Sequence, residues 1–208
     1  MSEINTERLL LRPFRESDAA DVLEYLSGPL PHCFAGLRID TPDEARAEVV
    51  KRAEDTEYCF AIVLKETGRV IGEIDTEPSD YRPPMPRSRE TPPPPPDTFT
   101  PSIILNAAYH SSGYAYEATY ALFDYLFTRK GVRRIYSYAD DYNACSQHLC
   151  EKLGMRREGL FRSFVSFVDD AEGNPVYENT MQYAILKHEW ISNTKTMASA
   201  PNPGYDAG

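Results

Sequence analysis

The chain has 208 residues, of which 41% are hydrophobic and 26% charged, a composition that suits one globular domain large enough to fold alone. A net charge of −10 and a pI near 4.9 argue against a nucleic-acid partner, because binding to phosphates requires concentrated lysine and arginine. The same charge is compatible with a cationic substrate such as an amine.

Hydrophobic periodicity and turn residues predict the order of the elements along the chain. They are a strand at residues 7–13, a helix at 18–28, a loop at 29–40, a helix from 41, strands at 58–65, 69–76 and 102–105, a helix at 113–129, a strand at 132–139, a helix at 143–153, and strands at 161–168 and 177–186. The second helix start is the clearest, since Thr41 is followed by Pro42 and two acids. A mixed α/β layer fold of one domain, residues 1–190, follows.

Two segments depart from this pattern. Residues 77–99 contain nine prolines and are predicted to be a loop insertion, which we favour over a proline-rich docking site because loop tips accept insertions at little cost. Residues 191–208 lack periodicity and are predicted to be a flexible C-terminal tail.

Several common sites are missing. The four cysteines and four histidines lack zinc or redox spacing, so we expect no metal. The P-loop, G-x-G-x-x-G and G-x-S-x-G motifs are also absent. The N-terminus has no apolar signal region, and no segment approaches the roughly 18 apolar residues that span a bilayer. We therefore expect a cytoplasmic protein with reduced thiols.

The first candidate site lies where the strand at 102–105 leads through small residues into the helix that begins near Gly113. Backbone N–H groups at such a helix start are unpaired and carry the positive end of the helix dipole, so they favour a phosphate or diphosphate. The alternative is a plain strand-to-helix turn in which Ser111 or Ser112 caps the helix.

The second candidate site is the start of the helix at 143–153. Asn143 and Ser146 are three residues apart and share a face there. The alternative is that Asn143 is an ordinary N-cap and Ser146 a polar residue of the first turn. Neither site alone identifies an enzyme.

Five segments, taken in order, resemble one known family over roughly residues 6–190. They are Thr6-Glu7-Arg8-Leu9-Leu10-Leu11-Arg12-Pro13, His110-Ser111-Ser112-Gly113-Tyr114-Ala115, Tyr114-Ala115-Tyr116-Glu117-Ala118, the stretch 143–159 with Asn143, Ser146 and Glu151-Lys152-Leu153-Gly154-Met155, and the stretch 183–190 ending in Glu189-Trp190. These segments resemble the RimJ/RimL-type branch of the GNAT superfamily. The resemblance implies a single domain with a mixed, mostly antiparallel central sheet flanked by helices, and acetyl-coenzyme A-dependent N-acetyltransferase activity.

The resemblance also assigns roles to residues. It implies that coenzyme A is bound by Leu105, Asn106, Ala107, His110, Ser111, Ser112, Gly113, Tyr114, Ala115, Asn143 and Ser146. A backbone N–H of Leu105 or Asn106 would bind the acetyl carbonyl, and Ser146 would stabilise or protonate the departing thiolate. Cys150 stands where many members of the superfamily have a tyrosine, and we expect Cys145 and Cys150 to be small buried residues.

The chemistry of the acceptor is less defined. Glu73 is the candidate general base, with a water relay as the fallback and an exposed or salt-bridged Glu73 as the alternative. The resemblance places the acceptor pocket between residues 29–38 and 164–177, where Phe34, Phe164 and Tyr177 would shape it. The acids of the turn, Asp169, Asp170 and Glu172, could attract a cationic amine or simply be solvated.

Two functions remain open at this stage. The first is acetylation of a primary amine, which could be a small molecule, an amino sugar or a protein N-terminus. The second is a non-catalytic module that binds coenzyme A or a partner, motivated by the departures at His110, Ser111 and Cys150. Homodimerisation is kept as an option, and the preferred acyl chain depends on a pocket depth that sequence does not give.

Overall fold

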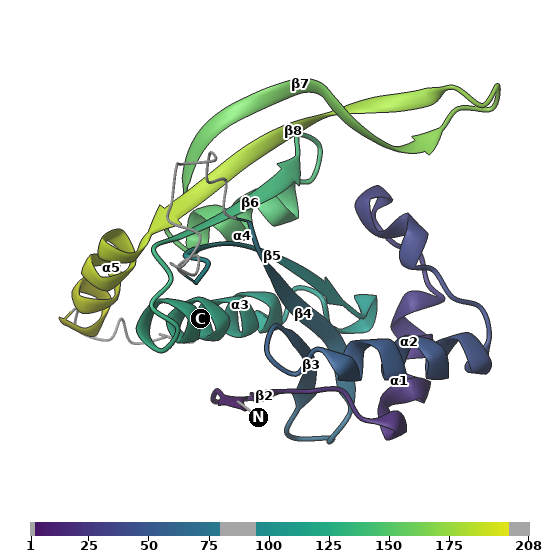
Figure 1. The fold of residues 1–208 in the computed structure, drawn as a ribbon, viewed down its shortest axis with the longest axis horizontal. Coiled ribbons are helices and arrows are strands. Elements are labelled where there is room, and N and C mark those ends of the chain that lie inside the picture. The colour runs from purple at the N-terminus through teal and green to yellow at the C-terminus, as the bar shows by residue number, and fades with distance from the viewer. Residues whose placement is uncertain (1–2, 80–94, 200–208) are drawn as a thin grey trace, which may run out of the picture.

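The computed structural model describes residues 3–79 and 95–199, which form one open sheet covered by helices on both faces (Figure 1). The strands are β1 (Ile4–Asn5), β2 (Leu9–Arg12), β3 (Cys59–Leu64), β4 (Val70–Pro78), β5 (Thr98–Leu105), β6 (Arg134–Asp140), β7 (Arg156–Asp169) and β8 (Pro175–Leu186). The helices are η1 (Glu16–Asp18), α1 (Ala19–Leu26), η2 (His32–Leu37), α2 (Pro42–Glu54), η3 (Ala107–Tyr109), α3 (Tyr114–Thr128), α4 (Ala144–Lys152) and α5 (Lys187–Ser199).

The sheet has the strand order β1-β2-β3-β4-β5-β6-β8-β7, and only the β5–β6 pair is parallel among the described strands. This confirms the predicted fold class of a mixed, mostly antiparallel sheet flanked by helices. The predicted hairpin is β3–β4, and the predicted second helix is α2. In α2 the Thr41 hydroxyl and the Glu44 carboxylate cap each other's backbone N–H groups.

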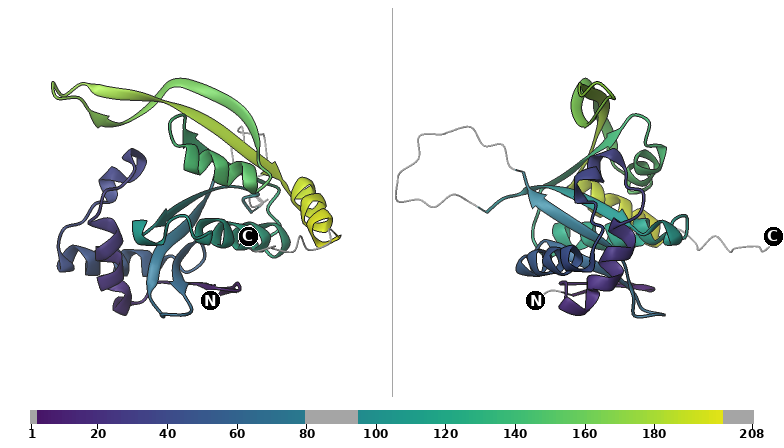
Figure 2. Two further views of the ribbon diagram at one scale, coloured as in Figure 1. Left: turned by 180° about the vertical axis from the view of Figure 1, so that it is seen from behind. Right: turned by 90° about the vertical axis from the view of Figure 1, so that its right-hand side faces the viewer.

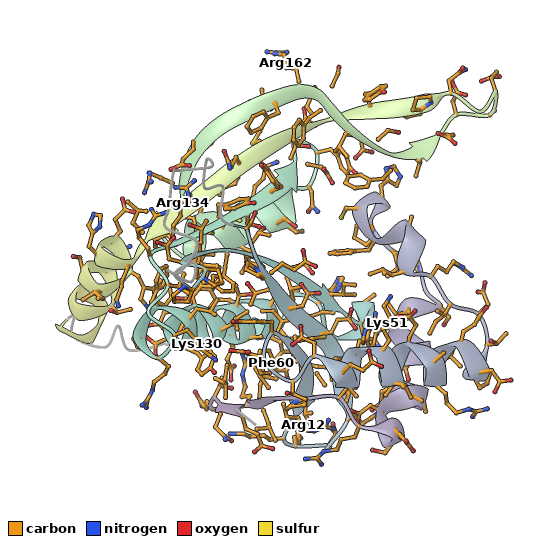
Figure 3. The ribbon with its side chains drawn as sticks, viewed as in Figure 1. Arg12, Lys51, Phe60, Lys130, Arg134 and Arg162 are labelled. Atoms are coloured by element: carbon orange, nitrogen blue, oxygen red, sulfur yellow. The ribbon has the colours of Figure 1, made fainter. Side chains whose placement is uncertain are left out.

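Alternate residues of the central strands divide the core into two layers. Leu9, Phe60 and Ile74 pack with α3, whereas Val63 and Ile104 pack with α1 and α2 on the opposite face. Phe60 is fully buried and lies inside the body in Figure 3, while the outward side chains of Lys130 and Arg162 mark the surface. No helix in the described part of the chain is long and apolar enough to cross a membrane.

The parallel strands β5 and β6 separate soon after they begin. Their ladder contains only the pairs Thr98 with Arg134 and Phe99 with Ile135, and the strands then diverge (Figure 1). On the other side of β5, Asn106 N donates to Ile71 O and Ser79 N donates to Thr98 O, each at 2.9 Å. Because such bonds alternate along an antiparallel strand, even-numbered residues of β5 bond to β4 and odd-numbered residues face β6.

Pro101 explains why the sheet splits at this point. It is an odd-numbered residue of β5, so the N–H that it lacks is the one that would have faced β6 just past the last pair. Proline therefore removes the ladder hydrogen bond that would have continued the β5–β6 pairing. The backbone N–H groups of Ile103 and Leu105 consequently point into the gap.

Two segment predictions need correction. Residues 77 and 78 continue β4 and residues 98 and 99 begin β5, because Glu77 pairs with Thr100 and Pro78 with Phe99. Pro78 is tolerated because its nitrogen faces the β3 side beyond the start of that strand. The rest of the predicted loop, residues 80–94, lies outside the described residues.

The predicted tail is helical as far as it is described, since α5 continues to Ser199. Sequence periodicity missed this helix because it depends on one anchor. Trp190 is buried and its ring packs against Tyr120, Phe123 and Phe127 of α3.

The last two strands form a long hairpin that projects from the body (Figure 2). Its outer strand, β7, is mostly exposed, and Arg162 points away from the body in Figure 3. The acids of its turn are exposed, and Asp170 accepts hydrogen bonds from Asn174 N and Glu172 N, which lower the pKa of Asp170.

Candidate active site

The start of α3 presents a row of unpaired amides. Gly113 is the N-cap and adopts a left-handed conformation, with φ +80°, and Ser111 is also left-handed, with φ +59°. Within the part of the chain that the structure describes, the N–H groups of residues 111–116 have no hydrogen-bond acceptor. No Ser111 or Ser112 side chain caps the helix. The turn therefore differs from the plain capped alternative and leaves donors available for an anion.

The N-terminal motif holds this turn in place. Arg8 Nη1 donates to Ser112 O at 2.9 Å, and its guanidinium lies 4.5 Å from the centre of the Tyr114 ring. Arg8 Nε also pairs with Glu117 Oε2 at 2.7 Å, while Thr6 Oγ1 donates to Glu117 Oε1 at 2.5 Å. Burial would raise the pKa of Glu117, but these hydrogen bonds outweigh it and leave the pKa lowered. The motif thus ties β2 to the first turn of α3.

The residues between β5 and Ser111 make hydrogen bonds that bear on the roles the resemblance implied. Asn106 N is committed to Ile71 O, and the Asn106 side chain caps η3 by accepting from Ala108 N at 3.0 Å. His110 Nε2 lies 3.0 Å from Leu105 O and links the loop back to the strand. The amide of Asn106 is therefore unavailable as an oxyanion donor, whereas that of Leu105 faces the gap between β5 and β6.

The gap is bordered on its other side by α4. Asn143 caps this helix by accepting from Ser146 N at 3.1 Å, as the N-cap alternative predicted. The Ser146 side chain is partly buried, and its hydroxyl has no partner among the described residues. A small cavity of about 40 Å³ lies between the strands, and its lining includes Pro101, Ser102 and Cys150.

The cysteines of α4 differ from each other. Cys150 is buried as predicted, and burial raises the pKa of its thiol to about 12, so the thiol stays protonated and is a poor acid. The expectation of burial is wrong for Cys145, which is exposed because it lies on the outer side of the first turn.

The structure places Glu73 in a buried ion pair. Its carboxylate accepts from Arg52 Nε at 2.7 Å, from Arg52 Nη2 at 3.1 Å and from Tyr25 Oη at 2.7 Å. Burial alone would lower the pKa of Arg52, but the bonds to Glu73 outweigh it and leave the pKa raised. A carboxylate engaged on both oxygens by a guanidinium is poorly placed to accept a proton, so the geometry is that of the salt-bridged alternative.

A neighbouring acid was missed by the sequence analysis. Asp75 lies two residues along β4 from Glu73 and accepts from Ser102 Oγ at 2.8 Å, beside the point where the sheet splits. Burial raises the pKa of Asp75 to about 6, against the effect of that hydrogen bond. Only the strand register reveals this residue, since an isolated aspartate in a strand pattern carries no distinguishing signal.

The sheet face opposite α3 and α4 carries side chains suited to the substrate pocket that the resemblance predicts. Asp140 pairs with Thr180, and Thr180 pairs with Phe161, so the three form a row across β6, β8 and β7. Phe161 and Phe164 stack at 4.9 Å between ring centres, and Tyr138 contacts both. The structure thus brings Phe164 to this face.

The other two predicted acceptor residues differ in their surroundings. Phe34 is half-buried and packs on the core beneath α1 and α2. Tyr177 is 60% exposed, and because side chains alternate along a strand, it points away from the face that its neighbour Glu178 occupies. No three metal-binding side chains gather anywhere in residues 3–79 and 95–199.

The structure is an α/β protein in which the sheet splits beside the unpaired N-terminus of α3, and comparison with known proteins gives the family. The sequence model of the "Acetyltransferase (GNAT) domain" matches residues 8–156, which is more than half of the chain. The chain belongs to the GNAT acetyltransferase family.

Its relatives are named accordingly. The chain is 29% identical over 187 residues to the uncharacterized N-acetyltransferase YnaD of Bacillus subtilis (strain 168), covering 90% of this chain and 98% of that protein. The crystal structure of a GNAT-family acetyltransferase from Bacillus anthracis is 28% identical, with a TM-score of 0.72 over 90% of this chain and 99% of that one. The protein is therefore an enzyme of the N-acetyltransferase class.

A likeness in fold alone extends to a ribosomal-protein-S5-alanine acetyltransferase from Vibrio fischeri. It is 17% identical, with a TM-score of 0.65 over 91% of this chain and 99% of that one. Ribosomal-protein acetyltransferases are thus among several kinds of structural neighbour of this chain.

Proposed function

We propose that this enzyme transfers the acetyl group of acetyl-coenzyme A to a primary amine by direct attack. One observation carries the proposal: the amides of residues 111–116, which have no partner among the described residues, lie just past the end of β5, where β5 and β6 have separated. A diphosphate satisfies such amides through hydrogen bonds and the helix dipole. Backbone donors do this whichever side chains stand at His110 and Ser111, so the departures there do not remove the site.

The donor side would be completed by the strand and by α4. The amide of Leu105 faces the gap, where it can donate to the acetyl carbonyl and stabilise the oxyanion that forms there. Asn143 uses its side-chain oxygen as a cap, which leaves its amide nitrogen available to the pantetheine arm. Ser146, whose hydroxyl has no partner among the described residues, would meet the sulfur.

The reaction needs a neutral amine, because an alkyl ammonium titrates at about pH 10 and has no lone pair to donate. After losing one proton, the amine attacks the carbonyl carbon and forms the C–N bond. The C–S bond then breaks, its electron pair stays on sulfur, and the second amine proton passes to the thiolate with Ser146 as the relay. The products are an amide and free coenzyme A.

The acceptor face supports an amine rather than an anion, since it combines aromatic rings with acids and belongs to a chain of net charge −10. Small amines, amino sugars and protein N-termini all fit this description. The acidic charge and free cysteines further support the proposal of a cytoplasmic enzyme.

A thiol-release assay on an amine panel, preceded by thermal shift with acetyl-coenzyme A, tests the proposal. We expect stabilisation by the donor and turnover with at least one amine. Ser146→Ala should lower kcat at least 10-fold without weakening coenzyme A binding, because a lost relay affects the transition state alone. Ser17→Ala, at an exposed serine of η1, is the matched control.

Stabilisation by acetyl-coenzyme A without turnover of any amine would instead identify a non-catalytic binding module. Indifference to coenzyme A at millimolar concentration would contradict both functions.

A further inference from the structure

A histidine from the loop after α1 meets a glutamate from β8 at the acceptor face. His32 Nδ1 lies 2.6 Å from Glu178 Oε1, although the two residues are 146 positions apart. The Tyr142 hydroxyl donates to the other oxygen, Glu178 Oε2, at 3.1 Å. Glu178 is buried, whereas half of the His32 side chain is exposed, at 51%. The Glu178 carboxylate is therefore held by hydrogen bonds at both of its oxygens, and it orients the imidazole of His32.

The contact leaves the second ring nitrogen available. His32 Nε2 has no partner among the described residues, and a carboxylate on Nδ1 selects the tautomer in which Nε2 carries the lone pair. This is the arrangement by which a buried carboxylate orients a histidine for base catalysis.

The pair lies beside the C-terminal end of β6, the strand that borders the split. Tyr142 follows the end of β6, and β5 and β6 are parallel, so their C-terminal ends open at the same edge as the amides of α3. Glu178 and Thr180 alternate with Tyr177 along β8 and so share the face opposite α3 and α4. A group in the gap can thus be reached from the His32 side while the coenzyme occupies the α3 side.

An unsatisfied hydroxyl marks the same face. Thr180 is 3% exposed, and its Oγ1 has no hydrogen-bond partner among the described residues. It lies between Asp140 and Phe161 in the cross-strand row. Buried hydroxyls are normally bonded, so this one indicates a place for a bound polar group.

We propose that His32, oriented by Glu178, is the general base that takes the proton from the acceptor ammonium, an assignment that rests on the proposed acetyl transfer. The N–H bond of the ammonium breaks, its electron pair stays on nitrogen, and the proton moves to His32 Nε2, directly or through one water. Glu178 stabilises the imidazolium, which later releases this proton to solvent. The second amine proton leaves with the thiolate as described above.

The other titratable groups around His32 are less suited to this role. Tyr142, from the loop after β6, has its pKa raised by burial and by Glu178. Burial raises the pKa of the Cys33 thiol in η2 to about 11. Asp140, at the end of β6, has its pKa raised by burial but is only 6% exposed. Imidazole is the side chain that most often serves as a base at neutral pH.

The test compares His32→Gln with the wild type in the thiol-release assay, with the best amine of the panel, between neutral and alkaline pH. We expect kcat/KM of the variant to fall about 100-fold at pH 7, with an unchanged coenzyme A Kd. The deficit should shrink to a few-fold at about pH 9.5, where the amine deprotonates without help. His188→Gln, at an exposed histidine of α5, is the matched control.

Glu178→Gln separates a positioning role from a packing role. It keeps the shape of the contact but removes the charge that stabilises the imidazolium. We therefore expect kcat/KM to fall at pH 7 and to recover at about pH 9.5, as in His32→Gln. A glutamate that only packs against its neighbours would lower kcat/KM by the same factor at every pH.

Three results would overturn the assignment. Wild-type rates in His32→Gln would do so, as would a loss of kcat/KM that is equal at every pH, since a base defect must respond to amine ionisation. A wild type that acetylates no amine overturns the proposed function and the base together, whereas an active wild type with an active His32→Gln overturns the base alone.

Discussion

The buried pair of Glu73 and Arg52 gives a prediction that separates structure from catalysis. Glu73 is 4% exposed and Arg52 is 9% exposed, and two hydrogen bonds of 2.7 and 3.1 Å join them. Glu73→Gln removes the charge but leaves Arg52 buried beside a neutral amide. Breaking one partner of a buried pair costs about 3–5 kcal/mol when the remaining charge loses its counter-ion. Arg52 keeps its second ion pair, with Glu48, so the lower end of that range applies.

Urea unfolding at pH 7 measures this cost. We expect Glu73→Gln to lower the free energy of unfolding by about 3 kcal/mol, and the melting temperature by roughly 6–12 °C for a chain of this size. Replacing both partners, as Glu73→Leu with Arg52→Met, should recover most of the loss because no charge is left buried. Glu54→Gln, an exposed carboxylate on the same helix as Arg52, is the control.

The kinetic half of the experiment decides the role of Glu73. Below its melting temperature the folded Glu73→Gln enzyme should retain kcat within a few-fold, since both carboxylate oxygens are already occupied in the wild type. A 100-fold fall in kcat with unchanged stability would refute this reasoning and restore Glu73 as the base.

Two further predictions concern the site and its surroundings. Gly113→Ala should lower the free energy of unfolding by about 1–2 kcal/mol because φ is +80° there, and it should also weaken coenzyme A binding. Gly68→Ala, with φ +70° and open space around it, should lower stability by a similar amount and leave the calorimetric Kd for coenzyme A unchanged. Equal Kd values for the two variants would contradict a diphosphate site at the start of α3. The pKa of Asp75 is higher in the folded state, about 6, than in the unfolded state. The stability that protonated Asp75 contributes is therefore complete below about pH 4 and is lost as the pH rises through about 6. Asp75→Asn should remove that dependence and raise the unfolding free energy at pH 7 by up to about 3 kcal/mol, as measured by urea unfolding across this range; parallel pH profiles for the two proteins would contradict it.

The sequence predicted the features that local chemistry determines. The capped start of α2, the β3–β4 hairpin and the turn before α3 each depend on residues close together in the chain. Their capping and glycine signals are therefore readable without the fold. The family resemblance, which rests on the order of the motifs, predicted the mixed, mostly antiparallel sheet.

Features that depend on distant partners were not predictable. The role of Glu73 depends on Tyr25 and Arg52 from two helices, and the pairing of His32 with Glu178 spans most of the chain. The helix α5 is aperiodic in sequence because a single anchor, Trp190, fixes it to α3. In each case the structure depends on a tertiary interaction, which local sequence propensity does not predict.

The proposed function depends on one claim: the backbone amides at the start of α3 bind the diphosphate of coenzyme A. Titrating isotope-labelled protein with coenzyme A, and in parallel with pantetheine, which lacks the diphosphate, measures this directly by amide chemical shifts. We predict saturable shifts concentrated at residues 111–116 with coenzyme A and none there with pantetheine. Equal responses to the two compounds, or no response to millimolar coenzyme A, would contradict it.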